Sequence, residues 1–101
     1  MSTHGSYIAM ECVPDTLQND IDKAVEILKA AGCMECYIFG SIAAGSADEN
    51  SDIDIAICGL PPERFFYVYG QMPAKIDLTD LDDGSRFSLR LRRRGAMVRV
   101  F

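Results

Sequence analysis

The run from residue 52 to residue 58 restricts the fold of this chain more than any other stretch. Its residues alternate as the two faces of a β-strand do. One face carries Ile53, Ile55 and Ile57, and the other carries Asp52, Asp54, Ala56 and Cys58. A chain of 101 residues makes one hydrophobic core, so the isoleucine face must pack into it. The sequence therefore predicts a single domain, residues 1–101, with a sheet that has one apolar face and one face led by carboxylates.

A long amphipathic helix precedes this strand. We expect it from Asp15 to Ala31, with Pro14 before it and Gly32 as a left-handed stop. Asp15 can cap the helix, and Gln18 completes a plausible capping box. Its apolar face consists of Leu17, Ile21, Ala24, Val25 and Leu28. Residues 1–13, which include the only histidine, are expected to be poorly ordered or peripheral.

The other elements alternate between strands and helices. Strands are predicted at 35–39, 74–81 and 96–101, helices at 63–71 and 85–94, and a loop with room for a helical turn at 40–51. The order α-β-β-α-β-α-β predicts an α/β (α+β) fold in which helices pack on a small mixed sheet.

Charge is distributed unevenly along the chain. All fifteen acidic residues lie at or before Asp83, whereas the residues from Gly84 onward include six arginines, and the net charge is −5. The acidic residues before Gly84 disfavour direct binding of nucleic acid by the chain as a whole. Binding through the basic C-terminal stretch remains an open alternative. No apolar run approaches the roughly 18 residues of a membrane-spanning helix, and no signal peptide is visible. We therefore expect a cytoplasmic protein whose four cysteines are reduced.

Two metal patterns are weak. Cys33 and Cys36 have the spacing of a redox or zinc half-site, but no second cysteine pair or histidine pair accompanies them. Small buried side chains at a helix-to-strand junction are the favoured interpretation. The segment from Asp48 resembles a calcium loop, yet Ile53 stands where glycine is required and Gly59 where glutamate is required.

The strongest chemical pattern is Gly40-Ser41, ten residues, then Asp52-Ile53-Asp54. Gly40 lets the backbone approach an anion, and Ser41 can donate its hydroxyl and N–H to a phosphate. Asp52 and Asp54 point to one face, where like charges raise each other's pKa unless they share a cation such as Mg²⁺. Asp77 interrupts a third apolar strand and also needs a partner. The alternative is that the aspartates occupy the solvated face of an edge strand.

These motifs resemble the nucleotidyltransferase superfamily of DNA polymerase beta, and within it the minimal nucleotidyltransferase (MNT) group. The resemblance runs from about residue 15 to 101. It is carried by Gly40-Ser41-x10-Asp52-x-Asp54, by Ile76-Asp77-Leu78 and by the terminal pattern Phe87-x3-Leu91-x3-Gly95. It implies a polymerase beta palm-like nucleotidyltransferase fold in which three carboxylates hold two Mg²⁺ ions.

The resemblance also implies a role for each motif residue. Asp52 and Asp54 would bind both metals, and Asp77 would complete one site and serve as general base or position it. Gly40 and Ser41, together with Ser51, would hold the triphosphate of ATP or another nucleotide. An acceptor hydroxyl would attack the α-phosphate, and pyrophosphate would leave.

Two details of this site stay open in the sequence. Strand alternation puts Asp77 and Asp80 on opposite faces, and the resemblance favours Asp77 as the third ligand. Members of the family commonly carry an arginine where this chain has Ala44. An arginine from the stretch 86–94, or one from a partner, is the expected substitute.

The acceptor is expected to lie on another protein, because the chain has no further domain to bind one. MNT proteins are typically paired with HEPN-type helical proteins, as antitoxin and ribonuclease toxin. The resemblance therefore implies that this enzyme adenylylates a tyrosine of such a toxin. Two alternatives are a binding-only antitoxin with weak or lost catalysis and a transferase that acts on a small molecule.

Two stretches are candidates for the surface that contacts a partner. The run 64–69 holds four aromatic residues, of which Phe65 and Tyr69 are expected in the core beside Val68, with the others partly exposed. The second stretch consists of Arg90, Arg92, Arg93 and Arg94. It would meet an acidic partner or RNA held by that partner, unless it is only a solvated helix end.

Overall fold

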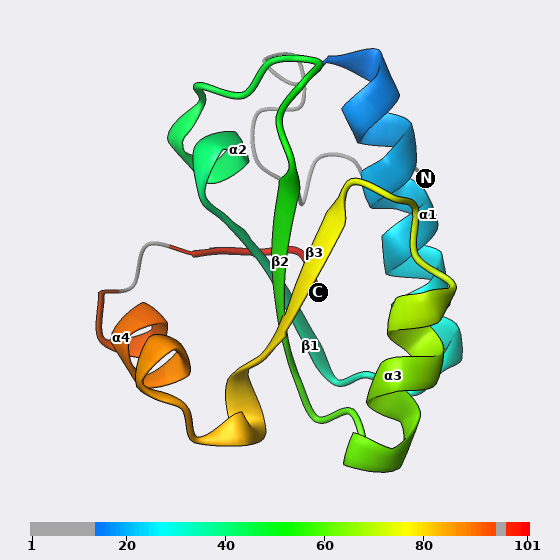
Figure 1. Ribbon diagram of the computed structural model, residues 1–101, viewed down its shortest axis with the longest axis vertical. Helices are drawn as coiled ribbons and strands as arrows, with labels where there is room; N and C mark the ends of the chain where they lie inside the picture. The colour runs from blue at the N-terminus through cyan, green and yellow to red at the C-terminus, as the bar shows by residue number, and fades with distance from the viewer. Residues whose placement is uncertain (1–13, 95–96) are drawn as a thin grey trace.

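Four strands form one mixed sheet in the order β3-β2-β1-β4, which confirms the predicted α/β fold class (Figure 1). The computed structural model describes residues 14–94 and 97–101. The helices are α1 (Asp15–Ala30), α2 (Ser41–Ala44), α3 (Pro62–Gly70) and α4 (Arg86–Arg94), with a 3-10 turn at Leu81–Asp83. The strands are β1 (Glu35–Phe39), β2 (Ile53–Cys58), β3 (Ile76–Asp80) and β4 (Val98–Arg99).

Strand β2 is an inner strand of the sheet and lies between β1 and β3. It pairs antiparallel with β1 and parallel with β3, while β4 pairs antiparallel with the other edge of β1. A parallel pair requires a crossover, and α3 provides it between β2 and β3. Strand β4 lies at an edge of the sheet, and β2 does not, so the alternative that the aspartates occupy an edge strand is wrong for β2.

Helix α1 begins and ends almost where the sequence predicts. The five predicted apolar residues are its buried residues. The expected capping box is not formed, because no side chain caps the first turn. Instead the carbonyl of Pro14 accepts the N–H groups of Leu17 and Gln18, each at 3.0 Å. Gly32 has the expected positive φ of 86° after the helix.

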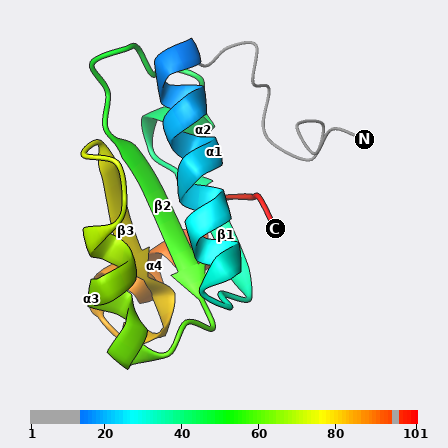
Figure 2. The same cartoon turned by 90° about the vertical axis from the view of Figure 1, so that its right-hand side faces the viewer.

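One face of the sheet is packed against α1 and α3 (Figures 1 and 2). The three isoleucines of β2 are 0% exposed there and join the main core with the apolar face of α1. From α3, Val68 is buried, and Phe65 and Tyr69 pack partly buried against the same core, as predicted. Phe66 and Tyr67 of this helix are 81% and 73% exposed.

The opposite face is only partly covered, by α4 (Figure 1), whereas α2 buries Ile42 in the main core. Ala56 and Cys58 of β2 pack against Leu81 and Leu91 in a second, smaller cluster. The same strand face therefore carries aspartates at its start and buried residues at its end. Helix α4 also buries Ser88, whose hydroxyl donates to a carboxylate oxygen of Asp83 at 2.8 Å.

Some sequence predictions concern residues outside this description. Residues 1–13, with His4 and Cys12, lie outside the described residues, as do Gly95 and Ala96 at the predicted join of the last helix and strand. Among the helices that are described, none is long and apolar enough to cross a membrane.

Candidate active site

The carboxylates meet on the partly open face because of the register of the parallel pair. Asp54 of β2 is the partner of Asp77 of β3, and on its other side it is the partner of Phe39 of β1. Paired residues of neighbouring strands project to the same side of a sheet. Because Ile53 and Ile55 point into the core, Asp54 and Asp77 share the opposite face. Asp52, which directly precedes the strand, is exposed.

The environment of Asp54 opposes its ionisation. Its carboxylate is half-buried, and burial raises the pKa of Asp54, as do the negative charges of Asp77 and Asp52 in decreasing order. The two other predicted ligands are thus close enough to repel Asp54 electrostatically. Among the described residues, however, no three His, Cys, Asp or Glu side chains are already gathered into a group that could hold a metal ion.

The donor set of this face nevertheless fits a hard cation. Asp52, Asp54 and Asp77 offer only oxygen ligands, which Mg²⁺ prefers. A cation between them would also relieve the repulsion that raises the pKa of Asp54. The two described cysteines of the CxxC pattern, Cys33 and Cys36, are buried free thiols, as the sequence analysis favoured. Burial raises the pKa of Cys36 to about 12, so it remains an uncharged core residue.

Gly40 is required where the chain passes Asp54. It has a φ of 74° and directly precedes α2. A Cβ at this position would overlap the Asp54 carboxylate, so no other residue lets the turn approach so closely. The Gly40-Ser41 turn and the Asp54 carboxylate are therefore neighbours, as the resemblance to the nucleotidyltransferase superfamily implied.

The loop from α2 to β2 is held by its own polar groups. The carbonyl of Ser41 accepts the N–H of Ser46 at 2.9 Å. The hydroxyl of Ser51 accepts the N–H of Asp48 at 2.9 Å and closes the turn that leads into Asp52. Ser51 therefore has a structural role here, and its predicted contact with a nucleotide remains a prediction. Ala44 is exposed and brings no charge to the loop.

The structure separates the two candidates for the third carboxylate. Asp80 sits at the end of β3, and its side chain accepts the N–H of Asp82 at 2.9 Å, so it caps the 3-10 turn. Asp77 instead lies beside Asp54 in the ladder. The geometry thus brings Asp77 into the candidate site and gives Asp80 a structural role.

Two residues near the site escaped the sequence analysis. The hydroxyl of Tyr69 lies 3.3 Å from a carboxylate oxygen of Asp77, to which it can donate across the β3 edge. Lys75 donates its ammonium to the carbonyl of Glu49 in the loop before β2. The helical position of Tyr69 gave no sign of this contact, whereas Lys75 lies in the predicted strand 74–81, two residues before Asp77.

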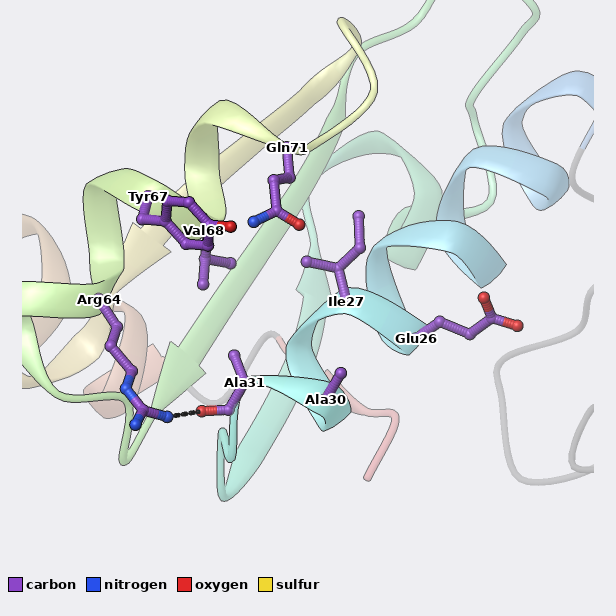
Figure 3. Close-up of a pocket in the computed structure, with 8 residues that line it drawn as sticks. All are labelled: Glu26, Ile27, Ala30, Ala31, Arg64, Tyr67, Val68 and Gln71. Atoms are coloured by element: carbon purple, nitrogen blue, oxygen red, sulfur yellow. Dashed lines mark hydrogen bonds between the residues drawn. The ribbon is translucent and has the colours of Figure 1, made fainter.

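A groove of about 550 Å³ between α1 and α3 lies on the other side of the sheet (Figure 3). It is lined by Glu26, Ile27, Ala30, Ala31, Arg64, Tyr67, Val68 and Gln71. Its arginine already donates to the carbonyl of Ala31 at 2.9 Å, which ties the two helices together. Because this groove lies behind the core face, we assign it to helix packing and the chemistry to the carboxylate face.

Comparison with known proteins bears on the family and the fold of this chain. Residues 22–92 match the family model described as "Polymerase beta, Nucleotidyltransferase". A crystal structure of a toxin-antitoxin with AMP-PNP superposes with a TM-score of 0.62 and 24% identity, covering 82% of this chain and 71% of that chain. At this identity the likeness concerns the fold alone. No curated protein matches the sequence.

Proposed function

Since the chain belongs to the polymerase beta nucleotidyltransferase family, we propose that it is a Mg²⁺-dependent enzyme that transfers AMP from ATP to a hydroxyl of a partner protein. The observation that carries this proposal is the register that puts Asp77 beside Asp54, next to the turn at Gly40. Three carboxylates on one face and a tight turn are the parts that phosphoryl-type transfer needs.

Each residue of the site has a part in the proposed reaction. Asp52, Asp54 and Asp77 would hold two Mg²⁺ ions, which supply Lewis-acid stabilisation of the phosphate oxygens when bound. Gly40, Ser41 and Ser51 form the side of the site that faces the triphosphate. The acceptor oxygen forms a bond to the α-phosphorus while the bond from that phosphorus to the bridging oxygen breaks. Pyrophosphate carries away the electron pair, and the hydroxyl proton passes to Asp77.

The partner is proposed to be a toxin of the HEPN type. The support is the fold shared with a crystallised toxin-antitoxin. The three described cysteines are free thiols, which supports a reducing compartment such as the cytoplasm.

The toxin would dock over α3 and α4. Four large apolar side chains are exposed on these two helices: Phe66, Tyr67, Phe87 and Leu89. Leu89 lies among Arg86, Arg90 and Arg93, which line a groove of about 230 Å³. An otherwise acidic chain thus presents a basic, partly apolar surface, so its partner should offer an acidic surface with apolar pockets.

A binding-only antitoxin is the second candidate, and Ala44 favours it. Without a basic side chain at this position, the α2 loop has less positive charge with which to bind a triphosphate. In that case the same surface would mask the toxin, and the chemistry would be weak or lost.

The test combines the purified chain, its toxin, Mg²⁺ and ATP labelled on the α-phosphate. The proposed enzyme transfers label to a toxin tyrosine, Asp54→Ala abolishes the transfer, and Glu26→Gln on the distant face of α1 leaves it unchanged. Toxin binding without label transfer supports the binding-only candidate. A chain that neither labels nor binds the toxin contradicts both.

A further inference from the structure

The candidate site has a deficit of positive charge. Its protein groups are three carboxylates and a loop, residues 44–51, that has alanine at position 44, two acidic residues and no basic one. A triphosphate is strongly anionic, and charge-assisted hydrogen bonds from lysine or arginine are the usual way in which proteins bind it. If this chain binds a nucleotide with Mg²⁺, as proposed above, a basic side chain from another element is the part of the phosphate site that the α2 loop does not supply.

Most described cations are already engaged elsewhere. Arg64 donates to the α1 carbonyl of Ala31 on the core side. Lys29 lies over the ring of Phe101, 5.3 Å from its centre. Arg99 donates to the carbonyl of that same residue at 3.1 Å.

The arginines of α4 do not fill the deficit either. Arg92 forms an ion pair with Asp82, with nitrogen and oxygen 3.3 Å apart. Arg86, Arg90 and Arg93 surround their own groove on the helix, away from the residues of the α2 loop. The expectation that an arginine of α4 replaces the missing loop arginine therefore finds no support among the side chains that the structure describes.

Lys75 is placed differently. It lies in the turn that directly precedes β3, in which the N–H of Ile76 donates to the carbonyl of Pro73 at 3.0 Å. Its own carbonyl accepts the N–H of Ile53 at 2.8 Å, so its backbone lies next to the residue that follows Asp52. Its contact with the Glu49 carbonyl confirms that the ammonium reaches toward the α2–β2 loop.

We propose that Lys75 is a phosphate-binding residue of this site and supplies, from the turn before β3, the positive charge that the α2 loop lacks at Ala44. The proposal rests on the nucleotide-binding function proposed above. An ammonium has three donors, and the Glu49 carbonyl takes only one of them. The remaining two can serve phosphate oxygens while the lysine still holds the loop that leads to Asp52.

The experiment separates the charge of Lys75 from its contact with the loop. Lys75→Gln keeps a hydrogen-bond donor for the Glu49 carbonyl but removes the charge, whereas Lys75→Arg keeps both. Lys23→Gln, an exposed lysine of α1 on the other side of the sheet, is the matched control. The probes are AMP-PNP and inorganic tripolyphosphate, each with Mg²⁺, in calorimetric titrations. Thermal unfolding of the ligand-free variants reports on the fold.

We expect Lys75→Gln to bind both probes about tenfold to a hundredfold more weakly than the wild type, with unchanged thermal unfolding. Lys75→Arg and Lys23→Gln should bind them within about threefold of the wild type. Equal binding by Lys75→Gln and the wild type overturns the role of Lys75 and leaves the proposed function standing. Weak binding by both Lys75 variants, together with a lower melting temperature, overturns it in favour of loop tethering. A wild type that binds neither probe overturns the proposed function itself.

Discussion

The two faces of the sheet differ in what they carry: one is packed in the core and the other bears the carboxylates, although β2 contributes to both. Toward α1 and α3, β2 presents three fully buried isoleucines that form the centre of the core. Toward the open side, the same strand presents Asp54, which lies between Phe39 and Asp77. Alternation along one strand thus fixes the position of a reactive carboxylate by the packing of its apolar neighbours. The core face therefore stabilises the fold, whereas the repulsion among the aspartates of the carboxylate face destabilises it.

The largest effect is expected from removing the central carboxylate. Asp54→Ala should lower the rate of nucleotide transfer at least about a thousandfold, because it removes a shared metal ligand and its charge. The measurement is the initial rate of label transfer from ATP, with circular dichroism to show that the fold persists. Transfer that survives in this variant would contradict the role of the carboxylate face.

The core face should respond in stability rather than in chemistry. Ile55→Ala removes a fully buried side chain and should lower the free energy of unfolding by about 2–5 kcal/mol. Phe66→Ala, at an exposed position of α3, is the control and should change it by less than about 0.5 kcal/mol. Urea unfolding at equilibrium measures both. Similar losses for the two variants would refute the contrast between the buried and exposed apolar residues.

Substitutions at Gly40 and Gly45 can distinguish the energetic cost of a positive φ from that of a close contact. Gly40 and Gly45 have φ values of 74° and 77°, but only at Gly40 would a Cβ meet Asp54. We expect Gly45→Ala to destabilise the fold by about 1 kcal/mol and Gly40→Ala by about 2 kcal/mol or more. Only Gly40→Ala should also weaken AMP-PNP binding. The free energies come from urea unfolding, and the binding comes from calorimetry. Equal effects of the two substitutions on unfolding and on binding would mean that the close approach of Gly40 to Asp54 contributes to neither.

The smallest effect is the pH dependence of stability that Asp54 causes on the carboxylate face. Because the pKa of Asp54 is raised in the folded state, its stabilising contribution is present at low pH and is lost as the pH rises through the folded pKa. Asp54→Asn should therefore raise the melting temperature of the ligand-free protein by a few degrees at neutral pH and have less effect in acid. A lower melting temperature at neutral pH would show that the other carboxylates do not strain the fold.

The same pH dependence predicts how Mg²⁺ acts. The metal binds the ionised carboxylates, so its stabilising effect on wild-type protein should fade as the pH falls through the raised pKa of Asp54. Thermal unfolding with and without Mg²⁺ at several pH values measures this. Asp54→Asn should show a smaller Mg²⁺ effect at every pH.

Residue patterns predicted most of the fold. The helices and strands followed from apolar spacing, and the face of Asp54 followed from the isoleucines beside it. The capping box failed because the carbonyl of Pro14 accepts the first free N–H groups of α1 without a side chain. The second core cluster was not predicted, since only tertiary packing brings Leu91 of α4 over Ala56.

The site was less predictable than the fold. The sequence placed Asp52, Asp54 and Asp77 on strands, but the register that joins them depends on how α3 returns the chain to the sheet. Tyr69 was assigned to the core, and its contact with Asp77 follows from that packing. Lys75 could have been found, because it is the one basic residue in the predicted strand 74–81 that carries Asp77.

The parallel register between β2 and β3 has a consequence for how this chain can vary over evolution. Because side chains of a strand alternate with a period of two, an insertion or deletion of one residue between Gly70 and Ile76 would turn Asp77 toward the core unless the turn absorbed it. Substitutions in that connection leave the register intact. Lys75 apart, we therefore expect the connection between α3 and β3 to tolerate exchanges of residue type better than changes of length.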